Sequence, residues 1–191
     1  MRESSRINAS RYNPVAGAGR LETISLDTLA QRPQNRESGD SLGFSKGQPD
    51  KTGDHRDLVL VVEDNQADVF LVEQAVALRK LPIRLLVLDN GDDAMRYFAQ
   101  TDVDSASRCP DAILLDLNLP RRSGREVLEH VKRTVRCRDV PVIILTSSNS
   151  PEDRRETAAL GAIRYFRKPT SYQEFLKIGE VLEEVLAQHR H

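Results

Sequence analysis

The sequence predicts an α/β domain in which helices cover both faces of a parallel β-sheet. Apolar runs of strand length occur at residues 58–62, 83–88, 112–115 and 142–145, and a fifth, short strand fits Ile163–Phe166. Apolar runs this continuous are typical of strands that are buried on both faces. Helical patterns separate the runs. Because crossovers between parallel strands are right-handed, we expect helices on both sides of the sheet.

The helical segments are recognised by apolar residues at helical spacing. The repeating apolar positions are Ala67, Leu71, Ala75 and Leu78 in one segment; Val127, Leu128, Val131 and Val135 in another; and Phe175, Ile178, Leu182 and Val185 in the last. Strand and helix therefore alternate along the chain, and no internal repeat interrupts the alternation.

Several helix ends are also marked in the sequence. Residues 123–126 and 170–173 each have the Ser/Thr-x-x-Glu/Gln pattern of a capping box. Ser150 precedes Pro151, which predicts an N-cap followed by proline at the first helical position. Gly161 lies where a left-handed residue would end a helix.

The first part of the chain has a different composition. Residues 1–57 are rich in Ser, Arg, Gly, Asn and Asp and contain few apolar positions. Such a segment cannot bury enough apolar surface to offset its ordering entropy, so we predict a disordered N-terminal extension before a domain at 58–187. A transit peptide is the less favoured interpretation of the extension. A start codon assigned too far upstream, or a flexible tether, explains the extension more simply.

Composition also restricts the class of protein. The formal net charge is -1, from 28 basic and 29 acidic side chains, which indicates neither nucleic acid nor an acidic membrane as the main partner. The sequence shows no transmembrane run and no signal-peptide core, so we expect a cytoplasmic protein. Cys109 and Cys137 lack metal-ligand spacing. Both fall near predicted strand starts at one end of the sheet, which leaves a disulfide open, but two free thiols are favoured.

Chemically active side chains directly follow four of the five predicted strands. They are Glu63 and Asp64, Asp116, Thr146, and Lys168. Ligands bind at the carboxyl ends of the strands in a sheet of this kind. Each residue alone has an ordinary explanation as a solvated acid, a capping hydroxyl or a surface lysine. Their combination predicts a site for phosphoryl chemistry.

Three carboxylates at one sheet edge repel each other unless a cation lies among them, and oxygen ligands suit Mg²⁺. An aspartate can accept a phosphoryl group as an aspartyl phosphate. The transfer requires positioning and positive charge near the phosphoryl oxygens. Mg²⁺, Lys168 and the Thr146 hydroxyl would meet that requirement.

These residues resemble the response-regulator receiver family of two-component signalling. The matching motifs are the acidic pair in VVEDN, the aspartate in ILLDLNLP with Gly124 after it, the hydroxyl in IILTSS and the lysine in YFRKPT. The resemblance spans residues 58–187 and none of the first 57. It implies a flavodoxin-like, doubly wound sheet of five parallel strands in the order 2-1-3-4-5.

The resemblance implies a role for each site residue. Asp116 is expected to be the phosphoacceptor. Asp64 is expected to bind Mg²⁺ directly and Glu63 through water, and the backbone carbonyl of Asn118 should complete the protein's share of the ligands. Lys168 should pair with the phosphoryl group.

Further residues are implied for the switch that follows phosphorylation. Thr146 should move toward the phosphoryl oxygens, and Tyr165 resembles the aromatic switch residue. Asn118 and Ser148 lie where the family tunes the lifetime of the phosphoryl group. The Lys168–Pro169 peptide bond is expected to be cis.

The stretches EDNQADVFLVEQAV and DLNLPRRSGREVL are most similar to single-domain regulators served by phytochrome-type sensor kinases. We therefore expect a single-domain response regulator that accepts a phosphoryl group from a sensor histidine kinase. It should act as a switch, not as an enzyme on a separate substrate. No output domain is expected after the last helix, so the output should be a contact with another protein. A homodimer remains open, and neither nucleic acid nor a membrane is expected as partner.

Two other classes of function are open to the same fold. A phosphorylation-independent adaptor would keep the sheet and bind a partner, but the full set of acids, hydroxyl and lysine argues against it. A small phosphohydrolase would use an aspartyl nucleophile after its first strand. Here the nucleophile candidate, Asp116, follows the third strand, so this class ranks low.

Overall fold

A computed structural model describes residues 9–12, 22–24 and 56–189. Its seven strands are β1 (Ala9–Tyr12), β2 (Glu22–Ile24), β3 (Asp57–Val62), β4 (Ile83–Leu88), β5 (Ala112–Leu115), β6 (Val142–Thr146) and β7 (Arg164–Arg167). The helices are α2 (Gln66–Leu78), α3 (Gly91–Val103), α4 (Gly124–Arg133), α5 (Pro151–Ala159), α6 (Tyr172–Phe175) and α7 (Ile178–His189). All seven strands form one sheet in the order β2-β1-β4-β3-β5-β6-β7.

The five predicted strands are confirmed as β3 to β7, and they are parallel to one another. Numbered by their order along the chain, they lie across the sheet in the order 2-1-3-4-5, as in flavodoxin-like folds. The first of them, β3, pairs with β4 on one side and with β5 on the other, with Val61 opposite Val87 and Leu114. The connections therefore diverge beside β3, which makes the carboxyl ends of β3 and β5 the expected ligand site.

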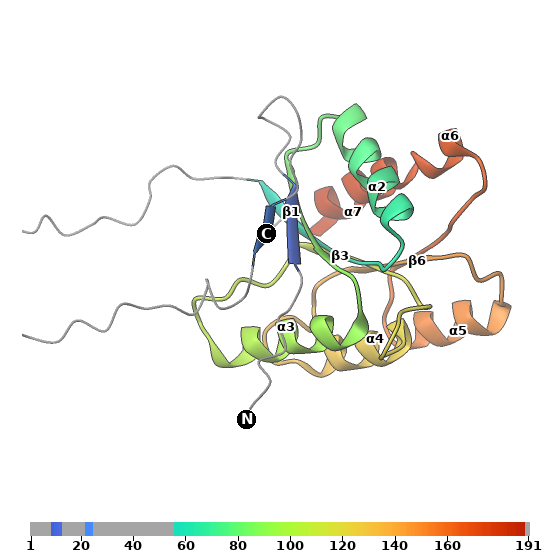
Figure 1. The fold of residues 1–191 in the computed structure, drawn as a ribbon. Coiled ribbons are helices and arrows are strands. Elements are labelled where there is room, and N and C mark those ends of the chain that lie inside the picture. The colour runs from blue at the N-terminus through green and yellow to red at the C-terminus, as the bar shows by residue number, and fades with distance from the viewer. Residues whose placement is uncertain (1–8, 13–21, 25–55, 190–191) are drawn as a thin grey trace, which may run out of the picture.

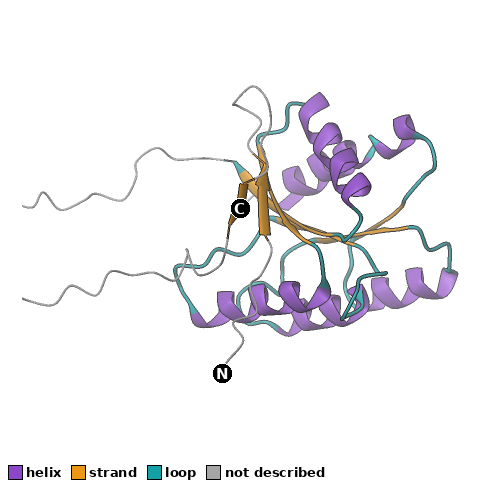
Figure 2. Ribbon diagram, in the orientation of Figure 1, coloured by secondary structure: helices purple, strands orange, loops and turns teal. Residues whose placement is uncertain are grey.

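Helices cover both faces of this sheet, as predicted (Figures 1 and 2). Helices α2, α6 and α7 lie on one face, and α3, α4 and α5 lie on the other. Each face has its own apolar core because alternate strand residues point to opposite sides. Val59 and Val61 belong to the core under α2 and α7, whereas Leu60 and Val62 belong to the second core.

The buried faces of two helices differ from the predicted stripes. In α2 the buried apolar positions are Val69, Val72, Ala75 and Val76, and Leu78 is 62% exposed. The valines are small, and they occupy the face that contacts the sheet and α7. Val135 is 78% exposed because α4 ends at Arg133 and Thr134 is already extended.

Most predicted helix ends are confirmed. Ser123 and Glu126 form the capping box of α4, and the Ser150 hydroxyl accepts hydrogen bonds from the backbone at the start of α5. Gly161 has a φ of 94° after α5, which glycine adopts without steric cost. The capping box predicted at 170–173 is wrong. Helix α6 begins at Tyr172 after Ser171, so the predicted pattern is out of register with the helix.

Two short strands lie within the predicted N-terminal extension. Strand β1 lies antiparallel to β4, and β2 pairs with β1. Without β1, β4 would be an edge strand with unpaired backbone groups, and another segment can bond to such groups through its main chain alone. Composition does not report such pairing. The remaining prediction for residues 1–55 lies outside the described residues.

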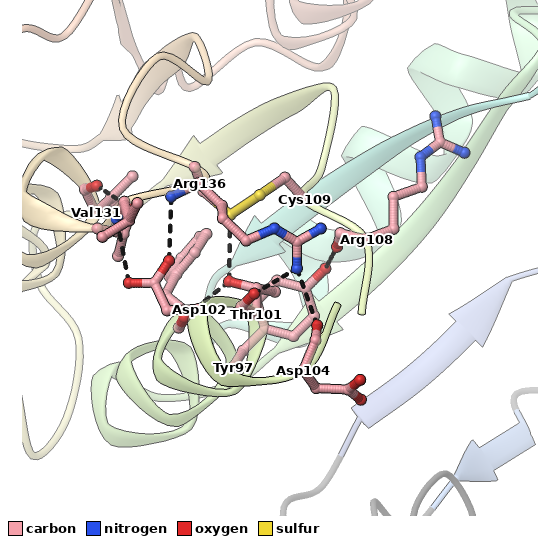
Figure 3. Close-up of a disulfide and its surroundings, with 12 residues drawn as sticks. Tyr97, Thr101, Asp102, Asp104, Arg108, Cys109, Val131 and Arg136 are labelled. Carbon is pink, nitrogen blue, oxygen red and sulfur yellow. Dashed lines mark hydrogen bonds between the residues drawn. A yellow bond between two sulfur atoms is a disulfide. The ribbon is translucent and has the colours of Figure 1, made fainter. Parts of the chain in front are cut away.

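The favoured prediction of two free thiols is also wrong, because Cys109 and Cys137 form a disulfide (Figure 3). Cys109 lies just before β5, and Cys137 lies before β6. Neighbouring parallel strands start at the same edge of a sheet, and here the two Cα atoms lie 5.6 Å apart. That separation suits a disulfide.

Among the described residues, no helix is both long and apolar enough to cross a membrane.

Candidate functional site

The five predicted site residues lie together at the carboxyl edge of the sheet. They are Glu63, Asp64, Asp116, Thr146 and Lys168. Backbone hydrogen bonds continue the sheet to three of these positions. The Glu63 amide donates to Leu88 O at 2.9 Å, and the Asp116 amide donates to Val62 O at 3.0 Å. The Lys168 amide donates to Thr146 O at 2.8 Å. The strands therefore fix the positions from which these side chains extend.

The Lys168 ammonium lies among three carboxylates. Its Nζ atom is 2.6 Å from Asp116 Oδ2, 2.6 Å from Glu63 Oε2 and 2.9 Å from Asp68 Oδ2. Burial acts to lower the pKa of Lys168, but hydrogen bonds to Asp116, Glu63 and Asp68 outweigh it and raise that pKa above its usual value. Lys168 is therefore positively charged at physiological pH.

Glu63 is fully buried at the end of β3. Burial raises its pKa to about 7, although the ion pair with Lys168 acts in the opposite direction, and the neighbouring Asp116 raises it further. The Asn65 amide donates to Glu63 Oε1 at 3.1 Å. The Lys168 ammonium therefore only partly offsets the cost of ionising the buried Glu63 carboxyl.

The acidic cluster fits a divalent cation. One carboxylate oxygen each from Glu63, Asp64 and Asp116 can be chosen so that all lie within 4.8 Å of one another. Asp64 is exposed, so its carboxylate can receive an ion from solvent. An all-oxygen donor set of this kind suits Mg²⁺ or a similar hard cation.

The loop after β5 is packed tightly against Asp116. The Asn118 amide donates to Asp116 Oδ1 at 3.1 Å, and the Gly124 amide donates to Leu117 O at 3.0 Å. A Cβ atom on Gly124 would lie 1.9 Å from Asp116 O, which no side chain can occupy. Gly124 is therefore required for α4 to start directly against the strand end that carries Asp116.

A chain of contacts runs from Thr146 to Tyr165. Thr146 is fully buried, and its Oγ1 accepts a hydrogen bond from the Ser148 amide at 3.2 Å. The Tyr165 hydroxyl donates to Ser148 O at 3.1 Å, and the Arg154 guanidinium lies 5.2 Å from the centre of the Tyr165 ring. The Ser148 hydroxyl donates to Asp153 Oδ2 at 2.5 Å. The end of β6 is thereby connected to β7 and α5.

Asp68 is a residue of this edge that the sequence did not predict. It lies in the first turn of α2, immediately after the loop that carries Glu63 and Asp64. A helix that begins at the carboxyl edge of a sheet places its first turn over that edge. An acid in the first turn was therefore the available signal.

The predicted cis bond at Lys168–Pro169 is wrong. No peptide bond is cis among the described residues, which include this pair. For a bond to proline the trans form is favoured by about 0.5–1 kcal/mol, and the loop after β7 adopts that form.

Fold and site together define an α/β domain with a cation-binding acidic edge next to a buried aspartate–lysine pair. The chain belongs to the response regulator receiver domain family, whose sequence model matches residues 59–179.

Relatives support this assignment. Response regulator Rcp1 from Synechocystis sp. is 32% identical over 126 residues, covering 66% of this chain and 86% of Rcp1. The crystal structure of the phosphorylated cyanobacterial phytochrome response regulator RcpA superposes with a TM-score of 0.64 at 31% identity, covering 71% of this chain and 97% of RcpA. The predicted similarity to phytochrome-associated regulators is thus confirmed.

The same comparisons bear on the cation. The Mn²⁺-bound form of Rcp1 matches with a TM-score of 0.61 at 32% identity, covering 67% of this chain and 92% of that one. A receiver domain of the sensor histidine kinase PA1611 from Pseudomonas aeruginosa, with a magnesium ion in its active-site cleft, matches with a TM-score of 0.56 at 26% identity. That match covers 69% of this chain and 98% of the PA1611 domain. This chain is accordingly a receiver that takes a phosphoryl group from a kinase, and its acidic cluster is consistent with a divalent-cation site.

Proposed function

We propose that this protein is a single-domain response regulator whose receiver spans residues 58–187 and whose phosphoacceptor is Asp116. The observation that carries the proposal is the position of Asp116. Its carboxylate lies at the topological switch point, 2.6 Å from the Lys168 ammonium, with two further acids beside it. The donor would be a phosphohistidine of a sensor histidine kinase. Similarity to RcpA favours a kinase of the phytochrome type.

In the proposed reaction an Asp116 oxygen attacks the phosphorus of the phosphohistidine. The phosphorus–nitrogen bond breaks, and the imidazole leaves as the acyl phosphate forms. Lys168 already touches Asp116 Oδ2, so a small movement would bring its ammonium to a phosphoryl oxygen. The Thr146 hydroxyl is the proposed second donor to that group. Receivers of this kind catalyse their own phosphorylation and hydrolysis, and they act on no separate substrate.

Mg²⁺ is the proposed cofactor. Glu63, Asp64 and Asp116, together with the backbone carbonyl of Asn118, would hold it. When bound, it would supply positive charge for the oxygens of the transferring phosphoryl group. The protein's own share is to fix the acids on rigid strand ends and to keep Lys168 charged.

The proposed switch follows the contacts from Thr146 to Tyr165. Phosphorylation replaces the single charge of the Asp116 carboxylate with a phosphoryl group that carries nearly two negative charges. If Thr146 turns toward them, its bond to the Ser148 amide is lost, and Ser148 carries the acceptor for Tyr165. The surface of α5, β7 and α7 would change as a result. Asn118 and Ser148 are the proposed determinants of phosphoryl lifetime.

The proposed output is a contact with another protein or with a second copy of this chain, not with nucleic acid or a membrane. A cytoplasmic location belongs to the same proposal, because histidine kinases draw their phosphoryl groups from ATP.

The experiment is phosphorylation of the full chain by acetyl phosphate, with and without Mg²⁺, read as a mobility shift on phosphate-binding gels. Asp116→Ala should abolish the Mg²⁺-dependent shift. Asp139→Ala removes an aspartate that is 93% exposed and serves as the matched control, which should behave as the wild type. No shift in well-folded wild-type protein would favour an adaptor. Continuous turnover of small phosphate esters would favour a phosphohydrolase.

A further inference from the structure

We propose that Cys109 and Cys137 form a reversible thiol–disulfide exchange site, with a dithiol as the reducing partner. The pair lies before β5 and β6, at the sheet edge opposite the carboxyl ends that carry Asp116. Nothing in the proposed phosphorylation mechanism uses these two residues. The inference therefore goes beyond the phosphoacceptor function and stands independently of it.

The two sulfurs differ in their access to solvent. Cys137 is fully buried, whereas Cys109 is only partly buried. Access decides which sulfur is attacked, so the proposal assigns the attack of an incoming thiolate to the less buried residue, Cys109. The disulfide bond breaks, the partner's sulfur bonds to Cys109, and Cys137 leaves as a thiolate that takes up a proton. In the mixed disulfide, the partner's first sulfur is bonded to Cys109. The partner's second thiol then attacks that first sulfur and releases Cys109. The partner is oxidised, and the cysteine pair is reduced.

The buried environment suits the reduced form of Cys137 as well as the oxidised form. Thr101 Oγ1 lies 3.2 Å from Cys137 Sγ and already donates its hydrogen to Phe98 O at 2.7 Å. The remaining interaction available to the Thr101 oxygen is to accept a hydrogen. A disulfide sulfur has none to give, but a Cys137 thiol would donate one. A buried thiol formed by reduction thus finds an acceptor in place.

The loops that carry the cysteines are held by contacts that do not involve sulfur (Figure 3). The Asp102 carboxylate accepts hydrogen bonds from the amides of Val135 and Arg136, at 3.2 and 3.1 Å. The Arg136 guanidinium donates to Thr101 O at 2.5 Å and to Asp104 O at 2.9 Å, at the end of α3. Opening the disulfide leaves these contacts in place, so reduction does not require unfolding.

The consequence of exchange is a change in stability. The bond closes a segment with a sequence separation of 28 that contains β5, Asp116 and α4. Closing such a loop restricts the unfolded chain, so the oxidised protein should melt roughly 5–15 °C above the reduced protein.

The test uses the folded full-length protein equilibrated with mixtures of reduced and oxidised dithiothreitol. Samples are quenched in acid, alkylated and weighed by mass spectrometry. Reduction and reoxidation should both go to completion without denaturant, with unchanged far-ultraviolet circular dichroism. Glutathione disulfide added to the Cys137→Ser variant should modify Cys109, whereas the Cys109→Ser variant should resist modification. Reduction that occurs only in denaturant, loss of structure on reduction, or faster modification of Cys137 would each overturn the proposal.

A second pair of variants tests the acceptor. Thr101→Val removes the oxygen, and Thr101→Ser retains it. Loss of the bond to Phe98 affects both redox states and cancels in the equilibrium. Thr101→Val should shift the equilibrium roughly twofold to tenfold toward the disulfide, and Thr101→Ser should not. Equal equilibria in the two variants would remove Thr101 from the site.

Discussion

The Lys168 ammonium lies 2.6 Å from Asp116 Oδ2, and the same nitrogen contacts Glu63 and Asp68. Its side chain is only 10% exposed. Lys168 therefore partly offsets the negative charge of three acids. The Lys168 side chain therefore has two roles. It stabilises the fold by pairing with buried acids, and it is the proposed partner of the phosphoryl group.

Replacement of Lys168 should destabilise the metal-free protein. Lys168→Ala leaves Glu63 and Asp116 buried without their partner, which costs about 3–5 kcal/mol in the free energy of unfolding. Added Mg²⁺ should stabilise this variant more than the wild type because it replaces the lost positive charge. Urea unfolding with and without Mg²⁺ measures both effects. Lys177→Ala, which removes an exposed pair with Glu174, is the control. Equal stability of the two variants would contradict the account.

Asp64 and Asp68 should differ in their effect on the cation. Asp64 belongs to the acidic cluster, whereas Asp68 contacts Lys168 from α2. Asp64→Asn should weaken Mg²⁺ binding at least roughly tenfold because a charged oxygen ligand is lost. Asp68→Asn should leave Mg²⁺ affinity within about threefold of wild type, since it removes no predicted ligand. Calorimetric titration compares the three proteins. An equal loss in both variants would show that the site extends to Asp68.

Gly124→Ala should disturb both stability and phosphorylation. The new methyl group would lie 1.9 Å from Asp116 O, so the start of α4 must move away from β5. Overpacking of this kind costs about 1–3 kcal/mol. The rate of labelling by acetyl phosphate should also fall, because Asp116 is carried by the displaced backbone. Unfolding curves and labelling rates equal to those of the wild type would show that the loop adapts without cost.

Glu73 predicts a pH dependence of stability. This residue lies on the buried face of α2, and burial raises its pKa above the usual value near 4.5. The raised pKa means that the ionised form is disfavoured in the folded protein. The contribution of Glu73 to stability is therefore fully present below the unfolded-state pKa and is lost as the pH rises through the folded-state pKa.

Glu73→Gln should remove this loss of stability at higher pH, because glutamine does not ionise. At about pH 4.5 the variant should have the same melting temperature as the wild type, and at about pH 8 it should have a higher one. Glu184→Gln, at an exposed position of α7, should leave the wild-type pH profile unchanged. A gain in melting temperature that is equal at both pH values would contradict the assignment to ionisation.

The sheet and the site were predictable because their signals are local in sequence. Four of the five parallel strands are largely apolar runs, and each site residue lies within two positions of the end of its predicted strand. Parallel pairing then brings the strand ends to one edge without further information. For this reason Glu63, Asp64, Asp116, Thr146 and Lys168 could be grouped before their geometry was known.

The features that were missed depend on contacts between distant segments. Asp68 reaches Lys168 across 100 positions of sequence (168 − 68), and its place in the first turn of α2 does not by itself identify Lys168 as the partner. The Cys109–Cys137 bond depends on the alignment of two strand starts. Strand β1 pairs with β4 through main-chain groups, which its composition does not reveal.

Locating the phosphoryl group on the chain tests whether Asp116 carries it. Protein treated with acetyl phosphate and Mg²⁺ is reduced with borohydride, which converts an acyl phosphate to an alcohol and marks the labelled residue. Peptide mass spectrometry then identifies the position. We expect the mark on Asp116 and none on Glu63 or Asp64. A mark on another residue while Asp116 remains unmodified would contradict it.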